Sequence, residues 1–362
     1  MHDRIGKQHR ARSVILWQCL GVVSLAEVAK LAGVGVGTAS RALTGKGSVD
    51  EATRARVVEA ASRLGYRGNA AARALRERRS RVVGLLLPDL NNEFYTASAE
   101  VLQSELAEAG FQLIVAQTSV RRNDEQMAWD RMLRWQVEGV VHVPVDPEAP
   151  VPQDIPVVQL NRRSRESTIP AVLSDDVEGI GLLTEHLITM GHRDIGVITG
   201  QANFSTTQER VEGFHRAWAR LNGPDVAANA GRVRARARVE NTELSVEGGV
   251  KAFAAFEADL PTAILALNSR ILLGVLSRCQ ELGLRVPEDI SVAAIGDPAW
   301  YAVWPPGITT FSPPLAEMGR RASHEIISLI EKTESGSEPQ VTRLAGEVIL
   351  RSSVAPPSRS RA

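Results

Sequence analysis

From residue 82 onwards the chain alternates between short apolar runs and longer amphipathic segments. The first run, Val82–Leu87, contains no charged or polar side chain, which is typical of a strand buried on both faces of a parallel sheet. Alternating strands and helices predict an α/β body with parallel sheets, and their number favours two lobes over one sheet. Further strands are expected at 112–116, 139–143, 157–160, 171–173, 195–198, 263–267 and 291–295, and helices at 96–109, 124–135, 177–190, 208–221, 244–256, 271–282 and 315–330.

Residues 24–67 follow a different pattern, that of three short helices. Ser24 and Glu27 have the spacing of a capping box at the start of the first helix, and Gly33 is placed to end it. The second helix is expected over 35–43. Two helices joined by a short turn predict a helix-turn-helix, in which the second helix enters the major groove of DNA. A generic three-helix packing unit is the alternative.

The third helix of this segment is expected to begin near Asp50 and to end at Gly65. Some of its apolar residues recur at helical spacing, so we expect them to form the face that packs against the other two helices. The expected face consists of Ala55, Val58, Ala61 and Leu64.

Charge separates the helical segment from the α/β body. The formal net charge of the whole chain is zero, but residues 1–81 carry 16 Lys and Arg against 6 Asp and Glu, a net charge of +10. The remaining residues carry 26 against 36, a net charge of −10. A basic module on an acidic body is typical of a nucleic-acid-binding head. On the second helix, Arg41 can bind a guanine edge, and Thr38 and Ser40 can bind phosphates.

The sequence favours a reducing compartment. Cys19 and Cys279 are too few for a disulfide framework and lack metal-type spacing. Basic residues before the apolar run 14–23 resemble a short signal peptide, but the helical pattern starts at Ser24, so we expect a cytoplasmic protein. Residues 1–23 are expected to be an N-terminal extension, with an ordered segment, a floppy tail and a misplaced start codon as the open alternatives. No run of 18 apolar residues predicts a membrane span. We expect no metal, cofactor or enzymatic activity, because no catalytic motif is present.

Four arginines alternate with small or apolar residues late in the body. They are Arg232, Arg234, Arg236 and Arg238. A strand would place all four on one face. We expect a solvated edge strand whose charges block aggregation, and attraction of an anionic partner is the alternative.

Several residue blocks stand in the order known from one family of regulators. The head contains 24–34 (SLAEVAKLAGV), 38–43 (TASRAL) and 64–66 (LGY), and the body contains 82–88 (VVGLLLP) and 286–292 (VPEDISV). With these blocks the chain resembles the lactose/galactose-repressor (LacI–GalR) family. The resemblance implies a small all-α helix-turn-helix DNA-binding domain at 24–67, a hinge helix and linker at 68–81, a two-lobed periplasmic-binding-protein-like α/β domain for effector binding and dimerisation at 82–351, and a flexible tail at 352–362.

The resemblance also assigns DNA contacts. Val36, Gly37 and Arg41 occupy the base-reading positions, and because Gly37 has no side chain, Val36 (at a thymine methyl) and Arg41 carry more of the direct readout. In the hinge helix Asn69 and Ala72 are implied DNA contacts, and Leu75 wedges into the minor groove and kinks the duplex. An ordinary linker residue is the alternative for Leu75.

For the body, the resemblance implies one lobe at about 82–171 plus 315–340 and another at about 174–311, with three crossings between them. A ligand would bind between the lobes at the carboxyl ends of the strands. Core packing is the alternative for the aromatic candidates, a helix cap for Asn268, and a surface ion pair with Glu212 for Arg210. The candidate effector-binding residues are Asp89, Phe94, Tyr95, Asn161, Thr206, Arg210 and Asn268.

The chain departs from the family pattern at some of these positions. Ser269 stands where an Asp is usual, Gly296 replaces the first of two carboxyl-type residues before Asp297, and Leu244 stands where a ring is common. A sugar pocket normally uses carboxylates to accept hydroxyl bonds, and Gly296 and Asn161 together remove two. We therefore expect an effector that is more anionic or less hydroxylated than a plain hexose.

The sequence thus predicts a ligand-responsive transcriptional regulator, a repressor that binds a near-palindromic operator as a homodimer. A sugar or sugar derivative between the lobes would change its operator affinity. A periplasmic-type sugar-binding protein without DNA function is the alternative. Candidates for part of the dimer contact are Ile271, Leu272, Val275 and Leu276, with packing inside their own lobe as the alternative.

Overall fold

The computed structural model describes residues 23–45, 47–66, 79–119, 122–165, 168–222, 235–332 and 340–358. The chain divides into two compact units, Met1–Ser80 and Arg81–Ala362. Each unit has its own hydrophobic core, so each is described by itself. Asn69, Ala72 and Leu75 of the expected hinge lie outside the described residues.

The first unit contains three helices, α2 (Leu25–Ala32), α3 (Val36–Thr44) and α4 (Glu51–Leu64). The capping box is confirmed, because the Ser24 side chain accepts from the Glu27 amide and the Glu27 carboxylate accepts from the Ser24 amide. Gly33 ends α2 in the left-handed conformation at φ 67°, which glycine adopts without strain. This tight turn between α2 and α3 is the turn expected of a helix-turn-helix.

The expected packing face of α4 was partly wrong. Ala55 is exposed and Val58 is 51% exposed, whereas Val57 and Ala60 are buried together with the correctly expected Ala61. Both sets of residues have helical spacing. The expected Leu64 also packs against the core, and contact with α2 and α3 covers Val57 and Ala60 rather than Ala55 and Val58.

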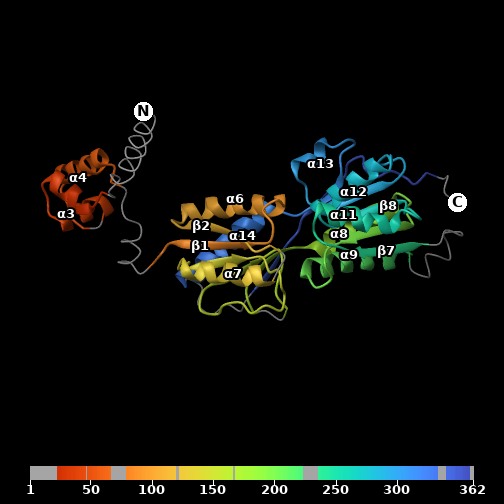
Figure 1. Ribbon diagram of the computed structural model, residues 1–362, viewed down its shortest axis with the longest axis horizontal. Coiled ribbons are helices and arrows are strands. Elements are labelled where there is room, and N and C mark those ends of the chain that lie inside the picture. Colours follow the sequence, from red (N-terminus) through yellow and green to blue (C-terminus); the bar gives the residue numbers. More distant parts are fainter. Residues whose placement is uncertain are drawn as a thin grey trace, which may run out of the picture. The chain divides into compact units, whose positions relative to one another are not determined.

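The second unit contains two six-stranded sheets with a helical layer on each face (Figure 1). The first sheet has the order β11-β5-β4-β3-β1-β2, and the second has the order β12-β10-β9-β8-β6-β7. We call the part of the unit built around the first sheet lobe one and the part built around the second lobe two. In the first sheet the strands are β1 (Val82–Leu87), β2 (Gln112–Gln117), β3 (Gly139–His142), β4 (Val157–Leu160), β5 (Ala171–Ser174) and β11 (Val341–Leu344).

Strand β1 shows why lobe one has helices on both faces of its sheet. Successive side chains of a strand point to opposite faces. Val83, Leu85 and Leu87 pack towards α6 (Glu93–Glu108) and α14 (Leu315–Glu331), whereas Leu86 packs towards α7 (Arg122–Arg134). Figure 1 shows α6 and α7 on opposite sides of this sheet. The continuous apolar run in the sequence therefore reflects burial on both faces.

Lobe two repeats this three-layer plan. Its strands are β6 (Asp194–Thr199), β7 (Arg236–Asn241), β8 (Ala263–Ala266), β9 (Ser291–Ile295), β10 (Thr309–Ser312) and β12 (Glu347–Ile349). One face is covered by α8 (Asp176–Thr189) and α9 (Ser205–Asn222). The other is covered by α11 (Val246–Phe253), the short η1 (Ala254–Phe256) and α12 (Ser269–Glu281), while α13 (Ala299–Val303) follows β9.

The chain passes between the lobes three times, as expected. It crosses after β5, between β10 and α14, and between β11 and β12. Strand β12 pairs antiparallel with β10, and every other pairing among the described strands is parallel. The amide of Asp175 donates to the carbonyl of Leu344 at 2.9 Å, which ties the first and third crossings together.

The expected edge strand is confirmed for its described part. Strand β7 lies at the edge of the second sheet, and its arginines face acidic side chains. Arg236 forms an ion pair with Asp259, and Arg238 forms one with Asp194. Arg232 and Arg234 lie outside the described residues.

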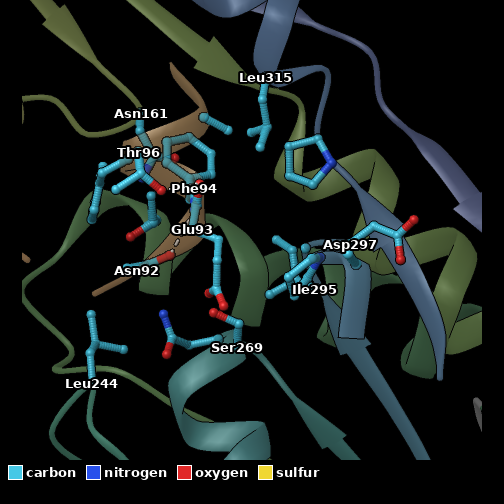
Figure 2. A pocket seen from close by; sticks show the side chains of 18 of the residues that line it. Asn92, Glu93, Phe94, Thr96, Asn161, Leu244, Ser269, Ile295, Asp297 and Leu315 are labelled. Atoms are coloured by element: carbon cyan, nitrogen blue, oxygen red, sulfur yellow. Dashed lines mark hydrogen bonds between the residues drawn. The ribbon is translucent and has the colours of Figure 1, made fainter. Parts of the chain in front are cut away.

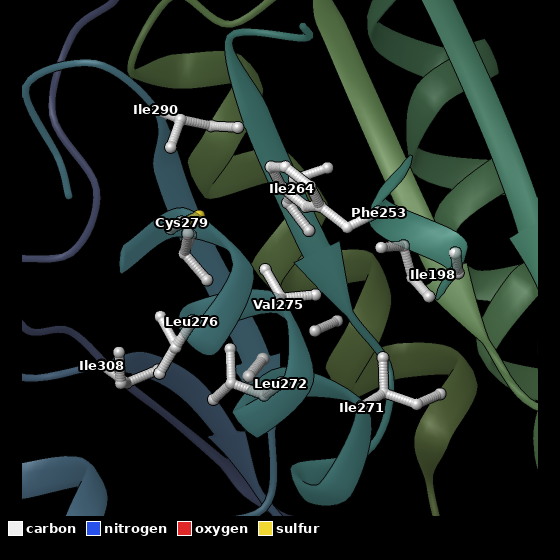
Figure 3. Close-up of a cluster of buried hydrophobic side chains, with 14 of the residues drawn as sticks. Ile198, Phe253, Ile264, Ile271, Leu272, Val275, Leu276, Cys279, Ile290 and Ile308 are labelled. Carbon is white, nitrogen blue, oxygen red and sulfur yellow. The ribbon is translucent and has the colours of Figure 1, made fainter. Parts of the chain in front are cut away.

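The proposed dimer residues on α12 are instead part of the core of lobe two. Ile271, Leu272, Val275 and Leu276 are at most 3% exposed and pack with Ile264 and other strand residues (Figure 3). Their helical spacing correctly indicated a buried face. The face is buried because the sheet of the same lobe covers it, so these residues cannot form a dimer contact.

The expected flexible tail was also wrong for its described part. Ser353 is fully buried, its hydroxyl donates to the Val292 carbonyl at 2.6 Å, and it accepts from the Thr309 amide at 2.8 Å. These bonds attach the segment after β12 to two strands of lobe two. Among the described helices, none combines the length and the hydropathy that a membrane span requires.

Candidate effector cavity and DNA-binding face

A cavity of about 650 Å³ lies between the two lobes of the second unit. Its walls come from segments that follow the carboxyl ends of β1, β4, β8 and β9, where open parallel sheets generally bind ligands. Figure 2 shows these side chains converging from both lobes. The lining includes the expected Phe94, Tyr95, Asn161, Thr206, Arg210 and Asn268, together with Asn92, Glu93, Thr96, Ala97, Glu100, Arg162, Leu244, Ser269, Ile295, Gly296, Asp297, Pro298, Ala299, Trp300, Pro313 and Leu315.

The amino ends of three long helices open into this cavity. Asn92 caps α6 by accepting from the Phe94 amide at 3.0 Å, and Asn268 caps α12 by accepting from two amides at 2.9 and 3.2 Å. Thr206 lies in the first turn of α9. Asn268 is therefore both a cap and a cavity residue. Helix amino termini carry partial positive charge, which favours an anionic or hydrogen-bond-accepting ligand.

The aromatic candidates belong to the core and to the cavity wall at once. The rings of Phe94 and Tyr95 pack edge to face with centroids 5.2 Å apart. Both contact the core of lobe one, where Tyr95 is 4% exposed, and both line the cavity. With Trp300 from the other lobe they supply apolar surface of the kind that packs on a sugar or base ring.

Arg210 is held in the cavity wall by fixed partners. Its Nε donates to Oδ2 of Asp176 at 2.6 Å and its Nη1 to the Leu267 carbonyl at 2.9 Å. The surface alternative is wrong, because Glu212 pairs with Arg216 instead. No described residue accepts from Nη2 of Arg210. The Arg210 guanidinium thus has one nitrogen to which the described residues offer no acceptor.

Asn161 and its neighbour Arg162 form the part of the wall that follows β4. Asn161 is 7% exposed, has a left-handed backbone at φ 64°, and its Oδ1 has no hydrogen-bond partner among the described residues. A buried unpaired oxygen and an uncommon backbone conformation together often mark a functional position.

Arg162 was not identified from the sequence. Its side chain is buried, its guanidinium lies over the Phe204 ring at 4.0 Å, and burial lowers its pKa. Its position directly after Asn161, at the end of a buried strand, was the available signal. No acidic residue next to Arg162 in the sequence suggested a buried ion pair, so the burial of Arg162 could not be predicted.

The acidic residues divide into neutralised and exposed groups. Asp297 lines the cavity, but Arg351 binds both of its oxygens at 2.7 and 3.0 Å. Asp89 is not among the lining residues, because it accepts from the amide and side chain of Asn91 in a local turn. Glu93, which was not among the expected ligand-binding residues, points across the cavity towards Ser269 (Figure 2).

The first unit has an exposed face on α3. Ala39 and Ala42 are buried against the other helices, and Val36, Gly37 and Arg41 are exposed on the opposite face. Val36 is 50% exposed, so its side chain is accessible to a partner. Thr38 and Ser40 are half-buried at the edges of this face.

Comparison with known proteins agrees with both units. The description "Bacterial regulatory proteins, lacI family" matches residues 24–69, and "Periplasmic binding protein-like domain" matches residues 184–354. A solved structure from Corynebacterium glutamicum, described as a transcription regulation repressor of the LacI family, is 34% identical. The match covers 76% of this chain and 99% of that one, with a TM-score of 0.65. The chain belongs to the LacI family.

Two further relatives of this LacI-family chain span nearly its full length. The transcriptional regulator MalR of Streptomyces coelicolor is 29% identical over 91% of this chain and 96% of its own. The solved complex of the transcriptional regulator CelR with cellobiose is 27% identical, covers 91% of this chain and 99% of that one, and has a TM-score of 0.65. As a LacI-family member, the chain is a transcriptional regulator with a DNA-binding head and an effector-binding body.

Proposed function

We propose that this regulator is a repressor that binds a near-palindromic operator as a homodimer in the cytoplasm and responds to a sugar derivative. The observation that supports this most directly is the cavity, since its walls come from both lobes and its lining combines hydrogen-bonding groups with aromatic faces. CelR, a relative with the same two-part plan, is solved with cellobiose. The dimer contact must use residues other than the four buried ones on α12.

The two-lobed construction gives the ligand a way to act on DNA binding. A ligand shifts an equilibrium only by binding one arrangement better than the other. A compound that touches both lobes binds best when they are closed around it, and the three crossings are the segments that must bend. The change in lobe arrangement would reach the head through residues 68–81.

The test begins with full-length protein and fragments of the source genome. We expect selective retention of fragments that share a near-palindromic sequence, and release or tightening of the complex by one class of small molecule. Ligand binding without sequence-selective DNA binding would contradict the proposal and favour the periplasmic-type alternative.

Arg41→Ala is expected to weaken operator binding by about 1–3 kcal/mol and to relax base choice at one position in each half-site. The exposed guanidinium on α3 can form two bonds to a guanine edge, which alanine cannot. Affinities for all single-base operator variants measure this. Arg63→Ala, an equal charge change on the exposed side of α4, is the control. A uniform loss across sequences with a smaller salt slope would mean that Arg41 contacts only phosphate.

Leu75→Ser is expected to lower operator affinity strongly, to leave nonspecific binding nearly unchanged, and to reduce DNA bending. A hinge segment as short as 69–75 is unstable alone in water, so we propose that it folds on the operator, where Leu75 unstacks one base step. Circular-permutation gel shifts measure the bend. Equal bending by the variant and the parent protein would show that the segment is a plain linker.

A further inference from the structure

The wall of the cavity contains a buried cation that no acid neutralises. Arg162 is 3% exposed. Its Nη1 donates to the Pro144 carbonyl at 3.4 Å, its Nε has no partner, and one face covers the Phe204 ring. Within the described ranges, no carboxylate oxygen lies within 4.0 Å of this guanidinium. An arginine stays charged under all ordinary conditions. The buried positive charge of Arg162 therefore has no acidic partner among the described residues, and an anion bound beside it would stabilise it.

The acidic residues near the cavity that could pair with Arg162 already bind other groups. Asp176 binds Arg210, and Asp297 binds Arg351. Glu125 is buried on lobe one, but its carboxylate binds His142 and the amides of Val145 and Asp146. Glu93 and Glu100 of α6 also line the cavity, and both are exposed. The buried part of the lining, here called the inner wall, is therefore positive, and the unpaired negative charge is on these exposed side chains.

Two further features strengthen the positive inner wall. Nη2 of Arg210 has no acceptor among the described residues, and the amino ends of α6, α9 and α12 add their partial charges. A buried charge is costly unless it is paired. An anionic group on the ligand would pair with Arg162 and would be stabilised by the same helix ends.

We propose that the effector is an anionic sugar derivative, a sugar acid or sugar phosphate, whose acidic group binds Arg162. The hydroxyl groups of such a ligand would bind Asn161, Asn268 and the exposed carboxylate of Glu93, which line the same cavity and supply acceptors and donors for them. This inference rests on the proposed function and names the ligand class for its cavity.

The test uses full-length protein and matched sets of compounds. Each set holds a neutral sugar, its uronic acid and its 6-phosphate, in the glucose and galactose series, and inorganic phosphate is the minimal probe. Binding is measured by thermal shift and calorimetry at constant ionic strength. Because a hydrogen bond to a charged group contributes about 1.5–3 kcal/mol, we expect an acid or phosphate ester to bind about 10- to 100-fold more tightly than its neutral parent.

Variants locate the effect. Arg162→Gln should remove the preference for the acidic compound, Arg162→Lys should keep part of it, and Arg163→Gln should keep all of it. Arg163 is the adjacent, exposed arginine, so the last variant carries the same charge change. If Arg162→Gln does not fold, the comparison of acid with neutral parent in the unaltered protein and in Arg162→Lys still decides the question.

Three outcomes would overturn the inference: tighter binding of the neutral sugars, binding of the acids that Arg162→Gln leaves unchanged, or no binding of any acid, ester or phosphate in the sets. Operator binding is measured on the same samples. An operator complex that responds only to neutral sugars overturns the ligand class and leaves the repressor assignment standing. Acid binding that depends on Arg162, in a chain that binds no operator, overturns the repressor assignment and supports the ligand class.

Discussion

Arg210→Ala is expected to lower the free energy of unfolding of the second unit by about 3–5 kcal/mol and to abolish the effector response. The side chain of Asp176 is 1% exposed, and Arg210 is its partner at 2.6 Å. The other carboxylate oxygen of Asp176, Oδ1, already has no hydrogen-bond partner among the described residues. Removing the guanidinium leaves a buried carboxylate without compensation, and it also removes the donor that faces the cavity. Urea unfolding and ligand-dependent operator binding measure the two effects.

The double variant Arg210→Leu with Asp176→Leu separates these two roles. Replacing both members of a buried ion pair by apolar residues is often nearly neutral for stability. We therefore expect the double variant to recover most of the lost stability while operator binding remains insensitive to the effector. A normal effector response in the double variant would show that Arg210 only supports the fold and that the ligand contacts lie elsewhere.

Gly274→Ala is expected to destabilise lobe two by about 1–3 kcal/mol, although alanine favours helix formation. Helices α11 and α12 cross where Gly249 meets Gly274. A Cβ atom at Gly274 would lie 2.1 Å from the Val246 carbonyl oxygen and 2.8 Å from the Val250 nitrogen. These are backbone atoms that cannot rotate away, so the helices must separate and loosen the core beneath them. Denaturant midpoints measure the loss.

The control for this substitution is another glycine inside a helix. A Cβ atom at Gly181 of α8 would meet nothing closer than the Gly213 carbonyl oxygen at 3.7 Å, an ordinary contact distance. Gly181→Ala is therefore expected to stabilise the protein by up to about 1 kcal/mol through helix propensity. Equal effects of the two substitutions would show that the close crossing of α11 and α12 does not constrain Gly274.

The parts of the fold that follow local rules could be predicted from the sequence. The bounds of β1, β4 and β9 match the expected runs, because strands buried on both faces consist mainly of apolar residues. Strands β10, β11 and β12 were missed. All three are short. Strands β11 and β12 are also partly exposed, and they pair with β5 and β10 from distant parts of the chain.

The lining residues of the cavity could be predicted where a residue lines it because it directly follows a strand. Asn161 and Asn268 follow buried strands, so their place beside the cavity follows from the parallel sheet. Asp89 also follows a strand, yet a local turn holds it away from the lining. The burial of Arg162 depends on Phe204 and Pro144, which the sequence does not place beside it. Helical periodicity likewise indicates that the face of α12 that carries Leu272 is buried. It does not indicate whether the same lobe or a second copy of the chain covers that face.

The three crossings between lobes bear on how this protein can exchange parts with its relatives. A single junction between residues 80 and 81 separates the head from the body. Each lobe, by contrast, is assembled from non-contiguous segments, and only residues 345 and 346 separate the last strand of one lobe from the last strand of the other. Transplanting one lobe would need three matched junctions. Recombination, in nature or in the laboratory, is therefore expected to move whole effector bodies between DNA-binding heads, so that operator choice and effector choice are inherited separately while the two halves of the cavity are inherited together.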